Sequence, residues 1–213
     1  MPLDAELTAR LRTWADEYPD PESSPEQREI DRVAEDEFLD SYAGLHEMDR
    51  DQVVAFVEWK FQSMPHRWTR ALEGVTEERW DAKTRAGDPP SPRELIRRAL
   101  AAEGDAGALH WLCPSGGVYG FGPAMGSVVL AACRSDRFTI ADTRALSTLD
   151  LYPIGPKSFR EADWIPYLGV CREIAEAVGL NLRDLGRTLD GRGARLSWTP
   201  APGMHTPTLA MCG

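Results

Sequence analysis

The sequence predicts an all-α protein of about ten helices. Apolar side chains recur every three or four residues over long segments, which is the spacing of amphipathic helices. Ser24-Pro25 and Ser91-Pro92 both have the pattern of a capping serine followed by proline at the first helical position. Strand signals are scarce, because residues 138–140 form the one short β-like run and have no neighbour with which to build a sheet. With 213 residues, 42% of them hydrophobic, the chain is long enough to bury a sizeable core.

Three helices are predicted in the first part of the chain. Residues 3–17 carry their apolar side chains on one face, and prolines follow directly. Residues 25–42 form a second helix. Asp49 caps a third, which ends at Met64-Pro65. The third helix is too apolar to face water all round, so we expect it at the centre of the core.

The remainder of the chain continues the helical pattern. Helices are predicted over residues 92–103, 106–112, 123–133, 164–178 and 181–189, with a further one directly after Asp142. Residues 193–213 are rich in proline, glycine and threonine and are predicted to form an irregular tail. The sequence contains no internal repeat.

The charge is distributed unevenly along the chain. Residues 1–50 hold 15 acidic and 5 basic side chains, whereas residues 51–213 hold 19 of each, so the whole net charge of -10 lies at the N-terminal end. We interpret this excess as a solvated acidic helix face. The other three quarters have enough arginine to build a local phosphate-facing surface. Composition therefore permits nucleic-acid binding without arguing for it.

Neither a membrane nor a metal is expected as a partner. No apolar stretch approaches the roughly 20 residues that cross a bilayer, and the N-terminus is polar, so export is not expected. Cys113, Cys133, Cys171 and Cys212 lie 20, 38 and 41 residues apart, without a Cys-x-x-Cys pair or a paired histidine spacing. This spacing does not suit zinc or an iron–sulfur cluster. We interpret the cysteines as reduced thiols of a cytoplasmic monomer.

A glycine turn precedes the helix expected at residues 123–133. Gly120-Phe121-Gly122 is followed by Pro123, which favours the first turn of a helix. The first amides of such a helix form an anion site, and phosphate is the obvious guest. Taken alone, a Gly-x-Gly before a helix is more often a plain turn. A dinucleotide fingerprint needs a strand before the glycines, whereas the preceding residues 108–112 are predicted to be helical. The context therefore favours a helix–hairpin–helix motif.

An aspartate follows this motif at a fixed distance. The hairpin Val118-Tyr119-Gly120-Phe121-Gly122 is followed by Ser127-Val128-Val129-Leu130 on the second helix and by Thr139-Ile140-Ala141-Asp142-Thr143-Arg144. In these 27 residues the chain resembles the helix–hairpin–helix DNA glycosylase superfamily, typified by endonuclease III. The resemblance implies two lobes with a cleft between them. One lobe would span residues 49–141, with the motif at about 106–133, and the other would combine residues 1–48 and 142–213.

The resemblance also implies roles for individual residues. Asp142 would be the catalytic carboxylate in the cleft. The hairpin residues Gly120, Phe121 and Gly122, with Ala124 and Arg144, would hold a backbone phosphate of DNA. A monovalent cation on the hairpin carbonyls is compatible with this arrangement, and no other cofactor is expected.

Four features depart from the family pattern. Ala124 stands where the lyase members carry the Schiff-base lysine, so a monofunctional enzyme is expected. Arg144 replaces a histidine and Tyr119 a proline, and the family's iron–sulfur cysteines are absent. Trp59 and Tyr119 are candidates for the base pocket. Lys60 could act beside them as an amine or phosphate ligand, or simply extend to solvent.

The leading hypothesis is a DNA glycosylase that hydrolyses the N-glycosidic bond of a damaged or modified base through Asp142. A second hypothesis keeps the fold without the chemistry, as a DNA-binding or protein-interaction module. A third, a helical regulatory protein that binds no nucleic acid, is favoured by the charge. Without the resemblance, Asp142 would be a plain helix N-cap.

Overall fold

The computed structural model describes residues 5–16, 24–61, 65–82, 88–113, 117–141, 145, 146, 149 and 160–190. Secondary structure in these residues is helical throughout, with no strand among them, which confirms the all-α prediction. None of the described helices combines the length and the apolarity that crossing a bilayer requires. The irregular tail and the start of the helix after Asp142 lie outside the described residues.

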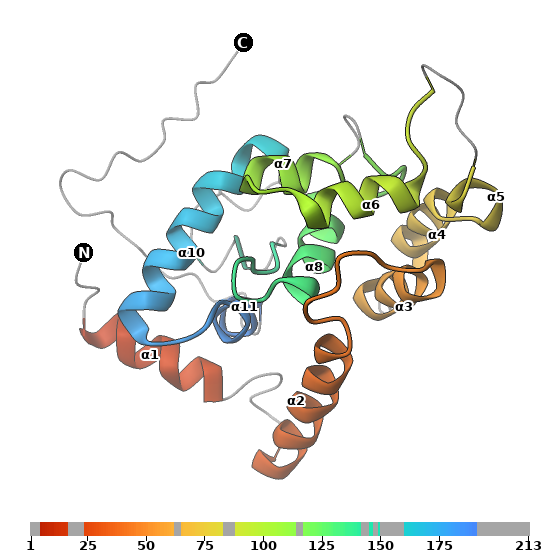
Figure 1. Cartoon of the computed structure of the whole chain (residues 1–213). Helices are drawn as coiled ribbons and strands as arrows, with labels where there is room; N and C mark the ends of the chain where they lie inside the picture. Colours follow the sequence, from red (N-terminus) through yellow and green to blue (C-terminus); the bar gives the residue numbers. More distant parts are fainter. Residues whose placement is uncertain are drawn as a thin grey trace.

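The helices follow the predicted order, with three additions (Figure 1). They are α1 (Ala5–Asp16), α2 (Pro25–Asp40), α3 (Arg50–Phe61), α4 (Pro65–Gly74), α5 (Glu77–Trp80), α6 (Pro92–Ala101), α7 (Asp105–His110), α8 (Pro123–Cys133), the short 3-10 helix η1 (Glu161–Asp163), α10 (Trp164–Val178) and α11 (Leu182–Asp190).

Side-chain caps start the helices where the sequence predicted them. The Ser24 hydroxyl accepts a hydrogen bond from the Gln27 amide at 3.2 Å and so begins α2. Ser91 accepts from the Glu94 amide at 3.4 Å and begins α6. Before α3, the Asp49 carboxylate accepts from the Gln52 amide at 2.8 Å. These contacts confirm three predicted helix starts.

Two helices, α4 and α5, are missing from the sequence prediction. The sequence predicts Pro65 only as the end of the preceding helix, yet it is also the first residue of α4. Proline suits both places, because it lacks the amide that a helix interior needs and that a first turn leaves unbonded. The second helix is also shorter than predicted. α2 stops at Asp40 and a turn follows, whereas the sequence predicted a helix as far as Tyr42.

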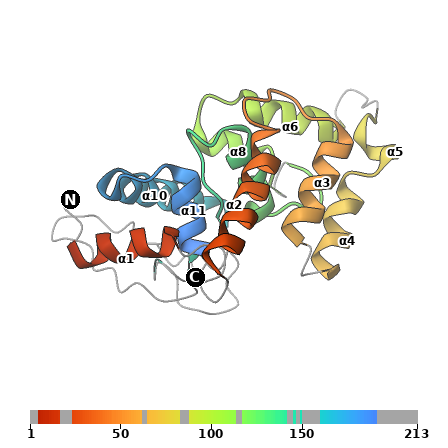
Figure 2. The ribbon, with the colours of Figure 1, turned by 90° about the horizontal axis from the view of Figure 1, so that it is seen from below.

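The centre of the fold is α8. It contacts α2, α3, α6 and α7, and the views in Figures 1 and 2 place it between α3, α4 and α5 on one side and α1, α10 and α11 on the other. Every side chain from Met125 to Cys133 is buried. The Gly44 amide donates to the Cys133 carbonyl at 2.8 Å and so satisfies the C-terminal end of this buried helix.

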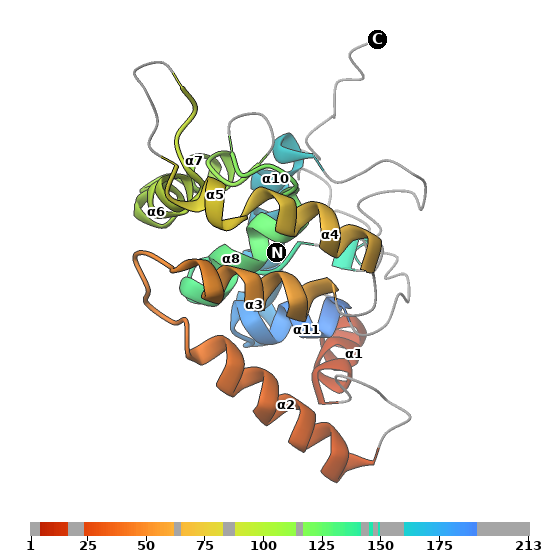
Figure 3. The ribbon, with the colours of Figure 1, turned by 90° about the vertical axis from the view of Figure 1, so that its right-hand side faces the viewer.

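The apolar helix α3 lies in the core, as predicted. Val53, Phe56 and Val57 are fully buried. Figure 3 shows α3 and α4 side by side, and contacts join them to each other and α3 to α8. On the other side of α8, the helices nearest the chain ends, α1, α10 and α11, contact one another. The division into two lobes at residues 49 and 142 stays a prediction.

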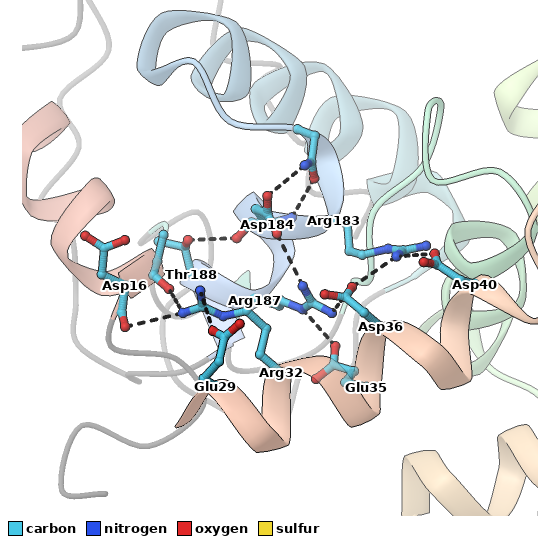
Figure 4. Close-up of polar contacts among 12 residues, drawn as sticks. Asp16, Glu29, Arg32, Glu35, Asp36, Asp40, Arg183, Asp184, Arg187 and Thr188 are labelled. Atoms are coloured by element: carbon cyan, nitrogen blue, oxygen red, sulfur yellow. Dashed lines mark hydrogen bonds and ion pairs between the residues drawn. The ribbon is translucent and has the colours of Figure 1, made fainter. Parts of the chain in front are cut away.

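The acidic N-terminal segment is only partly a solvated face. Arg187 of α11 is 7% exposed and lies 3.0 Å from Glu35 and 2.7 Å from Asp36, both on α2 (Figure 4). Arg183 lies 2.6 Å from Asp40 on the same helix. Some of the N-terminal acidity therefore attaches α2 to α11, which corrects the sequence interpretation.

Candidate functional site

The glycine turn predicted at residues 120–122 is present. The Phe121 amide donates to the Val118 carbonyl at 3.1 Å and closes the turn. Gly120 has a φ of +80°, the left-handed conformation that favours glycine. Gly122 has an extended backbone, with φ -109° and ψ 179°, which other residues also adopt. Of the two glycines, only Gly120 therefore has a backbone conformation that favours glycine.

Close packing against α4 accounts for Gly120. A Cβ atom added to this residue would overlap the backbone carbonyl of Arg70. Gly74, at the end of the same helix, faces the hairpin in the same way, because its Cβ would overlap the carbonyl oxygen of Tyr119. Two glycines thus let two backbones touch. The contact fixes the position of the hairpin relative to α4.

The N-terminus of α8 leaves backbone donors available for an anion. Gly122 is the N-cap and has no side chain to bond them, and Pro123 has no amide. Within the described part of the chain, the amides of Ala124 and Met125 form no hydrogen bond. The space beside Gly122 is open, since a Cβ added there would contact nothing within 4 Å. Phe121 is fully buried, so it would present only its backbone.

The chain segment that leads to Asp142 is held from two sides. The Ala141 amide donates to the buried Ser127 hydroxyl at 2.9 Å, and this hydroxyl donates to the Ala124 carbonyl at 2.9 Å. From α10, the Tyr167 hydroxyl donates to the Ile140 carbonyl at 2.7 Å. The residue before Asp142 is therefore attached to the first turns of α8, next to the hairpin.

Asp142 and Arg144 themselves lie outside the described residues. Their roles stay predictions. Two further residues of the same run are fixed by their surroundings. Ala141 is fully buried, and Thr139 is buried with its hydroxyl facing the backbone of Gly186 on α11. Thr139 and Ala141, which shortly precede Asp142 in the chain, are thus buried in the core and do not belong to an exposed loop.

Ser127 and Tyr167 were not predicted as functional residues. Ser127 has a signal in the sequence, because it is the one polar side chain in the apolar run from Met125 to Cys133. A buried hydroxyl in such a run needs a partner, which the Ala141 amide provides. Tyr167 has no comparable signal, since it lies 27 residues from the carbonyl that it bonds.

Replacing Ser127 by alanine is expected to lower the free energy of unfolding by about 1–2 kcal/mol, because the buried Ala141 amide loses its acceptor. Urea unfolding measures this loss, and hydrogen exchange at the Ala141 amide should become faster. Ser41→Ala is a matched control. Its hydroxyl also bonds a backbone carbonyl, that of Phe38 at 2.7 Å, but is exposed, so we expect a change below about 0.5 kcal/mol. Equal losses in both variants would contradict the anchoring role.

The base-pocket candidate Trp59 and its neighbour Lys60 lie at the end of α3. The Trp59 ring stacks on Phe38 of α2, with centroids 5.5 Å apart and an interplanar angle of 26°, and is half-buried at the edge of the core. Lys60 is half-buried in the last turn. Packing against Phe38 accounts for the position of Trp59 without any ligand.

Tyr119, the other base-pocket candidate, is exposed beside the hairpin. It is 48% exposed, and the guanidinium carbons of Arg70 and Arg79 lie 5.8 and 5.1 Å from its ring centroid. Both arginines come from the helices that the sequence prediction missed, α4 and α5. Sequence reasoning therefore had no means of placing them at the hairpin.

The described residues contain no group of three or more His, Cys, Asp or Glu side chains placed to hold a metal ion. Cys113, Cys133 and Cys171 are buried free thiols. Burial raises the pKa of each of them to about 12, so the thiolate is not formed near neutral pH. These three cysteines belong to the core and are poor nucleophiles.

Compared with protein-family models, with curated proteins and with solved structures, the chain matches none. The resemblance to the helix–hairpin–helix glycosylases therefore depends on the motif residues themselves. The geometry described above supplies the physical argument for a site at the hairpin.

Proposed function

We propose that this chain is a monofunctional DNA glycosylase that uses Asp142 as its catalytic carboxylate. The observation that carries the proposal is the Ser127 hydroxyl, which attaches the Ala141 amide to α8 at 2.9 Å. This bond brings the residue before Asp142 to the helix that begins at the hairpin. A backbone-phosphate site and a carboxylate at a fixed separation are what base excision requires.

The chemistry gives the carboxylate its role. Breaking an N-glycosidic bond builds positive charge on the sugar, and a nearby carboxylate stabilises this charge and orients the attacking water. The target nucleotide must first leave the base stack, which needs a firm grip on the backbone. The open face beside Gly122 and the amides of Ala124 and Met125 would supply that grip.

Ala124 restricts the proposal to hydrolysis. A lyase of this family type forms a Schiff base with an amine, and the alanine methyl group has no nucleophile. We therefore expect the product to be an intact strand with an abasic site. Strand scission would follow only after treatment with alkali.

A non-catalytic DNA-binding module is a second candidate. The packing of Gly120 against the Arg70 carbonyl favours it, because the hairpin needs this glycine for the fold even if no reaction takes place. The amides at the start of α8 would bind a phosphate in the same way in such a module. Catalysis thus depends on Asp142, and DNA binding does not.

The Asp142→Asn variant separates these two functions. We expect the wild type to produce alkali-labile sites in oligonucleotides that carry uracil, alkylated, oxidised or modified bases, in duplex or single-stranded form. The asparagine variant should lose at least about 10²-fold in excision rate, since it keeps the shape and removes the charge. Thermal unfolding of the variant serves as the control for folding.

Each alternative outcome has a distinct meaning. Salt-dependent DNA binding without excision of any base would support the non-catalytic module. Equal excision by wild type and variant would contradict the role of Asp142. Failure of the wild type to bind DNA even at low salt would contradict both candidate functions.

A further inference from the structure

The exposed side of the hairpin carries an aromatic ring that two arginines approach. Tyr119 is one of the exposed large hydrophobic side chains of the described chain, and it directly precedes Gly120. Arg70 from α4 and Arg79 from α5 both approach its ring, at 5.8 and 5.1 Å from the centroid. Attraction between each guanidinium and the ring holds them there.

Neither arginine is neutralised by a carboxylate in the described part of the chain. Ion pairs do form nearby. For example, Arg50 lies 3.8 Å from Glu77 at the start of α5. In the described residues, however, no such pair includes Arg70 or Arg79, and both side chains are exposed. Two like charges thus converge on one ring without a counterion from the described residues.

This combination favours an anion with several oxygen atoms. The two guanidinium groups repel each other, and an anion close to both would relieve that repulsion. A guanidinium presents donors in a planar fork that matches two oxygens of a phosphate. A phosphodiester is therefore a better guest for this position than an uncharged group.

The position of this cluster relative to α8 is fixed by backbone contacts. The Tyr119 carbonyl touches Gly74, and the Arg70 carbonyl touches Gly120, so the hairpin and α4 pack backbone against backbone. The cluster and the open start of α8 at Gly122 are then separated by only two residues of a closed turn. One DNA backbone can contact both.

We infer that Arg70, Tyr119 and Arg79 form a second phosphate-binding position for DNA, next to the position at the N-terminus of α8. The inference rests on the proposed function in that it takes DNA as the partner of the hairpin. It extends the DNA footprint from the hairpin onto α4 and α5, which carry Arg70 and Arg79.

Fluorescence anisotropy with a labelled DNA duplex and a labelled single strand tests the inference. We expect the double variant Arg70→Gln/Arg79→Gln to bind about tenfold more weakly at low salt. The slope of log K against log salt should become less steep by about 1 for the duplex, because the phosphate at this position is no longer neutralised. Tyr119→Ala should weaken binding as well, and Tyr119→Phe should not.

The Arg10→Gln variant is the matched control. Arg10 is also exposed and also lies over an aromatic ring, with its guanidinium carbon 5.3 Å from the Trp14 centroid, but on α1. We expect this variant to bind DNA as the wild type does. Thermal unfolding should be unchanged in all of these variants, since the arginines are exposed.

The outcomes distinguish the inference from the proposed function. Wild-type affinity and salt slope in the double variant, together with weak binding by Gly122→Ala, would overturn the inference and leave the proposed function standing. The same result is expected if the cluster is instead a contact for a protein. A wild type that fails to bind either DNA would overturn the proposed function and the inference together.

Discussion

Replacing Gly120 by alanine is expected to lower the free energy of unfolding by about 3 kcal/mol, whereas the same change at Gly122 should alter it by less than about 1 kcal/mol. The two positions lie in one turn, two residues apart. The comparison therefore holds the surroundings nearly constant and varies only the conformation and the free space at the substituted residue.

Two costs add at Gly120. Its φ of +80° is a conformation that costs an alanine about 1–2 kcal/mol. The new Cβ would also overlap the backbone carbonyl of Arg70, and a carbonyl inside α4 cannot rotate away as a side chain would. The hairpin would have to separate from α4, which removes the packing around Gly74 as well.

Neither cost applies at Gly122. Its φ of -109° is open to alanine, and the space around it is empty within 4 Å. Alanine is a poorer N-cap than glycine, but it also restricts the unfolded chain, and these effects nearly cancel. Urea unfolding of the two variants gives the comparison. Equal stability of both would show that the hairpin is not in backbone contact with α4.

The Gly122→Ala variant also separates stability from binding. Its methyl group would stand in the open space where the phosphate is expected to approach the amides of α8. We therefore expect a stable protein with weakened DNA affinity. Gly120→Ala should lose both properties together, because the hairpin itself is displaced.

Local signals in the sequence were sufficient for most helices. Ser24, Asp49 and Ser91 each bond an amide three residues ahead, so the whole interaction is contained in one short segment. The failure at Pro65 has the opposite cause. A single proline between two helices fits the end of one and the start of the next, so Pro65 alone does not indicate that a second helix begins there.

The candidate site depends more on contacts between distant segments. The need for glycine at residue 120 followed from the turn, but its partner on α4 lies 50 residues earlier in a helix that was not predicted. The Ser127 bond to Ala141 spans 14 residues and follows from the burial of a lone hydroxyl. The place of Asp142 in a cleft stays a prediction, because it depends on how distant segments meet.

Charge counting alone could not locate the partners of the acidic segment. The carboxylates of α2 and the arginines of α11 are about 150 residues apart, and neither group indicates the other in the sequence. The structure brings them together as one network that contains Glu35, Asp36, Asp184 and Arg187 (Figure 4).

Substitution of Arg187 by methionine is expected to lower the free energy of unfolding by about 3 kcal/mol at pH 7. Only 6% of this side chain is exposed, so its charge is largely removed from water and compensated by the carboxylates. Methionine keeps most of the volume and leaves the charges of Glu35 and Asp36 without the guanidinium 3.0 and 2.7 Å away. The main cost is the Glu35 carboxylate, which is only 12% exposed and loses this cation, whereas Asp36 is 38% exposed and keeps Arg183 at 3.1 Å.

The free energy of unfolding that Arg187→Met loses should depend on pH. Burial raises the pKa of Asp36, but hydrogen bonds and charges from Arg187 and Arg183 outweigh burial and hold this pKa below 3.8. A carboxyl group with a lowered pKa stabilises the fold above its unfolded pKa and loses this effect as pH falls through the folded value. The difference between wild type and Arg187→Met should therefore be full above about pH 5 and shrink below about pH 4.

Two further variants identify the cause. Arg97→Met removes an arginine that is half exposed and 2.8 Å from Glu94 on its own helix, so a loss of less than about 1 kcal/mol is expected. Adding Glu35→Gln and Asp36→Asn to Arg187→Met should recover part of the stability, because the uncompensated charges disappear with their cation. If the triple variant is instead less stable than Arg187→Met, hydrogen bonds and packing, and not charge compensation, hold α2 against α11.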